Sequence, residues 1–147
     1  MPMLHDRSFQ DSVAQRLKRL RPDAERQWGK MTADQMLWHL NSGLESALGR
    51  LKVTPVNVPL PKFMLKFLVI TVPWRKGKTP TRPEFEAKDR YDFEDERART
   101  LRLVDEFCSK PVDGAWHDNA FLGPLSGAEW SRLQGKHVDY HLRQFGA

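Results

Sequence analysis

Two stretches in the first third of the chain repeat their hydrophobic residues with the spacing of an α-helix. The first covers residues 6–20, where apolar side chains recur about every four positions until Pro22 stops the pattern. The second covers residues 32–48, and it opens with Thr32 and Gln35 at the spacing of a capping box. Both stretches are therefore predicted to be amphipathic helices with one buried face.

The last third of the chain contains two further stretches with this spacing. One runs from Phe93 to Ser109, with Asp92 as a candidate N-cap and Pro111 as the stop. The other covers residues 126–145 and opens with Ser-Gly-Ala-Glu, a second capping box. Two more long helices are predicted here.

Residues 51–90 show a different pattern. They hold six of the ten prolines of the chain, which excludes a long regular element. A short helix is predicted over residues 62–69, where Phe63, Phe67 and Ile70 are expected to share one face. This region is interpreted as a long crossover that folds back on the body of the protein.

These elements together predict an all-α fold. No stretch alternates with period two, so no strand is expected. The chain has 147 residues, the length of one domain of about 150 residues. We therefore expect a single domain over residues 1–147, a four-helix bundle with a long proline-rich crossover between the second and third long helices.

Composition narrows the function classes. The single cysteine, Cys108, excludes a disulfide framework and a zinc site made only of cysteines, and it is interpreted as a small buried hydrophobic residue. The first ten residues are polar and charged, and no apolar run approaches the roughly 20 residues of a membrane helix. A cytoplasmic protein without a membrane partner is expected.

The net charge of +5 is modest, but one region of the chain is purely basic. No acidic residue interrupts the cations of this region, which are Lys62, Lys66, Arg75, Lys76, Lys78 and Arg82. Either they form a solvated loop, or they form a patch that attracts anionic ligands or phosphates. Nucleic-acid binding ranks low, because no stacking platform and no reading helix accompany these cations.

Two histidines lie within the apolar stripe of the last predicted helix. His137 and His141 are one turn apart, and at 100° per residue they share a face with Trp130, Leu133 and Gln144. They are either buried, hydrogen-bonded core residues or two ligands of one metal ion. Burial favours the neutral imidazole that binds metals. A metalloprotease of the His-Glu-x-x-His type is disfavoured, because the position after His137 is valine.

His39, near the middle of the second predicted helix, is the candidate third ligand. Three histidines with an open fourth position are typical of a catalytic metal site, and they suit zinc, nickel, iron or copper. Gln35 lies one turn before His39 and Gln144 three residues after His141. Either glutamine is expected to orient a ligand or hold a metal-bound water, or else only to cap its helix.

Three segments of the chain carry a resemblance to a known family. Residues 28–39 (WGKMTADQMLWH) resemble the second-helix motif of the DinB/YfiT-like superfamily of metalloenzymes. Residues 121–130 (FLGPLSGAEW) and 136–146 (KHVDYHLRQFG) are similar to the end of one branch, a domain of unknown function. The resemblance implies a four-helix bundle and a divalent metal ion held by His39, His137 and His141.

The resemblance also implies a chemistry. Superfamily members include S-transferases that use low-molecular-weight thiols and thiol-dependent isomerases, so a thiol transferase or a small-molecule hydrolase is expected. Trp74, Lys76 and Lys78, in the basic crossover, are candidate substrate contacts, and the positive charge of this crossover is expected to hold the carboxylates of such a thiol. Relatives often pair, which implies a homodimer. The alternatives are a metal-binding module without chemistry and a metal-free bundle with buried histidines.

Overall fold

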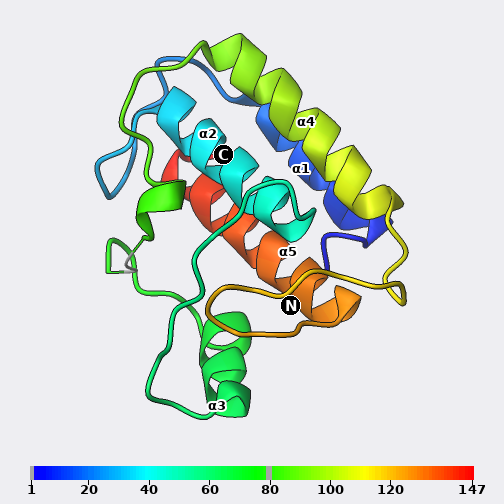
Figure 1. The fold of residues 1–147 in the computed structure, drawn as a ribbon. Coiled ribbons are helices and arrows are strands. Elements are labelled where there is room, and N and C mark those ends of the chain that lie inside the picture. Colours follow the sequence, from blue (N-terminus) through cyan, green and yellow to red (C-terminus); the bar gives the residue numbers. More distant parts are fainter. Residues whose placement is uncertain (1, 79–80) are drawn as a thin grey trace.

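The computed structural model describes residues 2–78 and 81–147, and these residues form an all-α structure (Figure 1). The α-helices are α1 (Arg7–Arg19), α2 (Ala33–Ala47), α3 (Lys62–Lys66), α4 (Phe93–Ser109) and α5 (Gly127–Gln144). The described residues contain no β-strand, which confirms the predicted fold class. Within these residues, no helix combines the length and the apolar character needed to cross a membrane.

The helices begin where the sequence places their caps. Ser126 Oγ accepts from the Glu129 amide at 3.1 Å, and Glu129 Oε1 accepts from the Ser126 amide at 3.0 Å. Asp92 caps α4 by accepting from the amide three residues later, and Gln35 Oε1 accepts from the Thr32 amide at 3.0 Å. These bonds satisfy amides that the first helical turn leaves unpaired.

The four long helices pack around a shared apolar core. Both α2 and α1 contact α4 and α5, and Figure 1 shows these helices side by side. The apolar stripes predicted from the sequence supply many of the buried side chains, but Val138 and Leu142 of α5 are fully buried outside the predicted stripe. The largest fully buried ones include Val13, Leu17, Met36, Leu37, Leu40, Leu44, Phe107, Trp130, Val138 and Leu142.

The connection between α2 and α4 carries α3, a π-helical turn η1 (Phe67–Thr71) and a 3-10 turn η2 (Pro83–Phe85). In Figure 1, α3 lies apart from the four long helices. The prediction that Phe63, Phe67 and Ile70 share one face of this segment was wrong. Phe63 and Phe67 are 74% and 59% exposed, whereas Leu65 and Ile70 are buried. The helix ends as a π-helical turn, whose wider spacing disrupts the register that the 3.6-residue pattern assumed.

Side chains of α5 hold this connection against the core. The Lys136 ammonium group donates to the Val69 carbonyl at 2.7 Å and to the Val72 carbonyl, and it lies 4.7 Å from the centre of the Trp74 ring. The Tyr140 hydroxyl accepts from the Gly77 amide at 3.2 Å. The connection therefore forms one wall of the space beside α5.

The N-terminal residues are also fixed to the helices. The His5 ring pairs with Ser131 Oγ and with the Lys110 carbonyl, each at 2.9 Å. Cys108 is half-buried beside the Leu4 carbonyl, and burial raises the pKa of its thiol to about 12. That pKa fits the prediction of a packing residue rather than a nucleophile.

Candidate metal centre

His39 points from the middle of α2 toward α5, and the crossover fixes its ring. Its Nδ1 donates to the carbonyl of Phe85, in η2, at 2.7 Å. A carbonyl only accepts, so the proton of the neutral ring lies on Nδ1 and the lone pair on Nε2. The ligand nitrogen of His39 is therefore Nε2.

The orientation of His141 is set in the same way by Gln144. Nδ1 of His141 donates to Gln144 Oε1 at 2.8 Å. The amide cannot turn over, because Gln144 Nε2 donates to the Trp28 carbonyl at 2.8 Å. Nε2 of His141 is therefore the free nitrogen of the ring. In metal sites, histidine ligands are commonly oriented in this way by a hydrogen bond from the other ring nitrogen.

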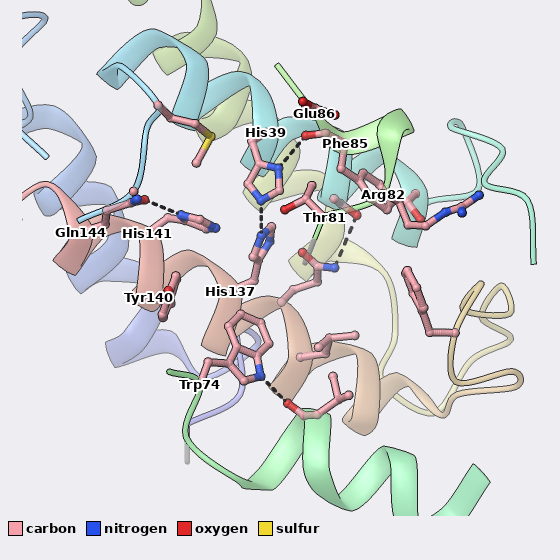
Figure 2. Close-up of a pocket in the computed structure, with 18 of the residues that line it drawn as sticks. His39, Trp74, Thr81, Arg82, Phe85, Glu86, His137, Tyr140, His141 and Gln144 are labelled. Atoms are coloured by element: carbon pink, nitrogen blue, oxygen red, sulfur yellow. Dashed lines mark hydrogen bonds between the residues drawn. The ribbon is translucent and has the colours of Figure 1, made fainter. Parts of the chain in front are cut away.

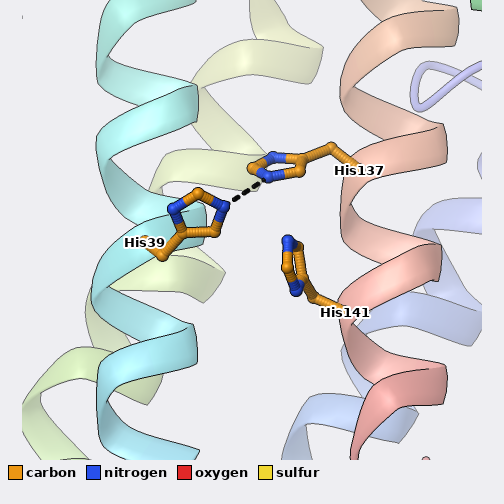
Figure 3. A group of neighbouring side chains, drawn as sticks. All are labelled: His39, His137 and His141. Atoms are coloured by element: carbon orange, nitrogen blue, oxygen red, sulfur yellow. Dashed lines mark hydrogen bonds between the residues drawn. The ribbon is translucent and has the colours of Figure 1, made fainter. Parts of the chain in front are cut away.

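The three imidazoles meet at one point between α2 and α5. Their ring centres are 4.7, 4.7 and 4.8 Å apart, and one nitrogen of each lies within 4.8 Å of the others (Figure 3). Nε2 of His39 and Nε2 of His137 are 2.9 Å apart, which also permits a direct hydrogen bond in the metal-free chain. Three converging neutral nitrogens are a donor set that a divalent metal ion fits.

Electrostatics keep this cluster uncharged. Burial lowers the pKa of His39. Burial is the main cause that holds the pKa of His137 well below its ordinary value, and the charges of the neighbouring His39 and His141 lower it further. For His141, burial and the charge of His39 lower the pKa to about 3. All three rings are neutral at pH 7, the state in which imidazole binds a metal.

A glycine allows α2 to approach the cluster. A Cβ atom built on Gly43 would lie 3.2 Å from both Cε1 and Nδ1 of His137, which is tighter than ordinary contact. Gly43 therefore keeps free the space that the His137 ring occupies. A glycine inside a helix lowers the stability of that helix. Here the close packing of α2 on α5 offsets this cost.

The cluster opens into a cavity of about 760 Å³ between α2, α5 and the crossover (Figure 2). All three histidines line it, and most of the remaining wall is apolar. Trp28, Leu65, Val69, Trp74, Trp130 and Leu133 contribute the larger apolar surfaces. A pocket of this size and character suits a small organic molecule.

The predicted site residues are only partly brought together. Gln144 contacts His141, and the Trp74 ring lies 6.1 Å from the His137 ring. Gln35 lines the cavity, but its amide caps α2 and donates to the Asp89 carbonyl at 2.9 Å. It makes no hydrogen bond to a histidine among the described residues.

The predicted role of Lys76 and Lys78 is not supported. Neither residue lines the cavity, and the Lys76 ammonium group lies 4.8 Å over the Trp28 ring. Other cations of the basic region serve the fold: Lys62 donates to the Phe121 carbonyl, and Lys66 pairs with Glu129 at 3.5 Å. Among the described cations of this basic region, Arg82 alone lines the cavity, and it pairs with Glu84 at 3.3 Å.

Sequence reasoning missed several groups at the site. Tyr140 lies three residues after His137 on the same helical face, so the spacing could have identified it. Its hydroxyl accepts from Trp28 Nε1 at 3.1 Å. The Phe85 carbonyl that orients His39 carries no sequence signal, because any residue supplies a carbonyl.

No family model, curated protein or solved structure matches the chain. The resemblance to the DinB/YfiT-like superfamily therefore stays a prediction from the three motifs. The homodimer and the thiol partner stay predictions as well.

Gln144 gives a first test of the geometry. Gln144→Leu removes the acceptor for His141 Nδ1, so zinc affinity should fall roughly 10- to 100-fold, as for other groups that orient metal ligands. Gln144→Glu retains an acceptor and should bind within a few-fold of the parent. Competition with a chromophoric chelator measures both affinities. Gln35→Leu is the matched control, and an equal loss in that variant would contradict the assigned role of Gln144.

Proposed function

We propose that this protein is a metal-dependent enzyme that acts on a small molecule, with a divalent ion held by His39, His137 and His141. The observation that carries this proposal is the convergence of three neutral imidazoles in the wall of a cavity of about 760 Å³. We further propose that α1, α2, α4 and α5 form a four-helix bundle of the DinB/YfiT-like type. Their mutual packing supports that proposal.

Three protein ligands favour a catalytic site over a purely structural one. Structural zinc sites are closed by four protein ligands, whereas catalytic sites keep a position for water or substrate. The described residues place only three metal-binding side chains in this cluster. Asp139, between the two histidines of α5, faces away and pairs with Arg16 and Arg143, each at 2.9 Å.

The reaction class that fits best is transfer of a low-molecular-weight thiol to an electrophile. A bound divalent metal ion would lower the pKa of the thiol as a Lewis acid. The sulfur then bonds to an electrophilic carbon, the leaving group departs with its electron pair, and the thiol proton is released to it through solvent. The apolar wall, with Trp74 and Leu133, holds the electrophile beside the reacting atoms.

The test compares metal-loaded with metal-free protein. Loading with zinc, nickel or iron should produce thioether from 2-mercaptoethanol or cysteine and an aryl halide, at a rate above the same metal in buffer. Liquid chromatography with mass spectrometry measures the product. Turnover of ester or amide substrates instead would identify a hydrolase. A protein that binds metal but turns over neither panel is a binding module, and the enzyme proposal then fails.

A further inference from the structure

Gln134 carries a buried hydrogen-bonding atom that the described part of the protein does not use. This residue lies on α5, three positions before His137, and it is only 4% exposed. Its Oε1 has no hydrogen-bond partner among the described residues. An unpaired buried acceptor destabilises a fold, so such groups usually have a partner outside the protein's own hydrogen bonds.

The orientation of the Gln134 amide is fixed. Nε2 donates to the Gly43 carbonyl at 3.4 Å, in α2. Turning the amide over would bring Oε1 against this carbonyl, and two acceptors repel each other. Oε1 is therefore the atom that the side chain offers to a ligand.

The free acceptor lies beside the histidine cluster. Gln134 lines the same cavity as the three histidines. A Cβ atom built on Gly43 would lie 3.5 Å from Gln134 Oε1 and 3.2 Å from His137 Cε1, so both groups border the same spot. The Gln134 oxygen and the histidine cluster therefore belong to the same part of the cavity wall.

The charge of the wall indicates what kind of molecule fits. Lys30 and Glu86 line the cavity but are exposed, and Arg82 pairs with Glu84 at 3.3 Å. The buried residues of the wall carry no charge, and their polar side chains are those of Gln134, Gln144, Tyr140 and the neutral histidines. A charged group deep in this cavity would meet no opposite charge there, which makes its desolvation unfavourable.

We propose that Gln134 Oε1 is a recognition acceptor for a neutral, largely apolar small molecule that presents an N–H or O–H donor beside the histidine cluster. The recognition site itself does not depend on the proposed function. Only the identification of the bound molecule as the substrate rests on it. Sites that hydrogen-bond a polar substrate group reject analogues that lack it, because the buried acceptor is then left unpaired. Gln134 thus determines specificity, separately from the metal ligands.

The experiment uses two probes of the same shape, benzamide and acetophenone. Benzamide carries an amide NH2 group where acetophenone carries a methyl group. Chemical-shift titrations of the 15N-labelled, metal-free chain measure both dissociation constants. The parent should bind benzamide about tenfold more tightly, and Gln134→Met should abolish the preference. Ser46→Ala, which alters another polar residue of the cavity wall, should preserve it.

Three results would overturn the inference: equal affinity of the parent for the two probes, binding of neither probe, or a preference that persists in Gln134→Met. The comparison within the parent needs no variant, so poor folding of Gln134→Met does not remove the test. Because no metal is present, the result is independent of metal uptake and turnover. A failure of the proposed enzyme function is therefore distinguishable from a failure of this recognition site.

Discussion

Replacing His137 and His141 together by alanine should remove all bound metal from the protein. The parent is expected to retain about one divalent ion per chain, because three preoriented neutral imidazoles converge on one point. The double variant keeps only His39, and a single imidazole cannot hold an ion through purification. Elemental mass spectrometry of untagged protein measures the difference, and it also identifies the metal.

The control for this pair is His117→Ala, which removes an exposed histidine outside the cluster. It should bind as much metal as the parent. Circular dichroism checks that the double variant keeps its helices, and His137→Gln offers a milder change at the same cluster. A parent that is purified without metal and takes up neither zinc nor nickel would show that these are buried core histidines.

The helices and the residues at their ends could be predicted from the sequence because their causes are local. The predicted limits of the four long helices agree with the structure to within a residue or two. Capping boxes and apolar periodicity depend on residues three or four positions apart, which a single sequence displays. The buried face of α3 and η1 was mispredicted because contacts between η1 and α5, such as that of Lys136 with the Val69 carbonyl, help to decide which side is buried.

The same distinction holds for the candidate site. His137 and His141 were found because both lie on one helical stripe, and His39 because a third ligand had to come from another helix. Their mutual approach depends on long-range packing that the sequence does not show directly. The Phe85 carbonyl and the free oxygen of Gln134 are defined only by their partners in space. Charge alone misplaced Lys76 and Lys78, since it does not reveal which cations face the cavity.

The metal-free protein should lose stability as the pH falls from 7 to 5. In the folded state the pKa of His141 is lowered to about 3, and those of His39 and His137 are lowered as well. The unfolded chain binds protons on these rings below about pH 6.5, whereas the folded protein binds fewer at the same pH. Acid therefore favours unfolding, by about 2 kcal/mol for His141 alone over this interval.

Urea unfolding in the presence of a chelator, at several pH values between 5 and 7, measures this dependence. His141→Leu removes one titrating group and should flatten the curve. Hydrogen bonds from Arg90 and the Tyr91 amide lower the pKa of Asp34 from 3.8 to about 2, so this residue contributes only below this range, where its protonation removes stability. A parent as stable at pH 5 as at pH 7 would mean that the histidines accept protons in the folded state. Burial would then not lower their pKa values in this way.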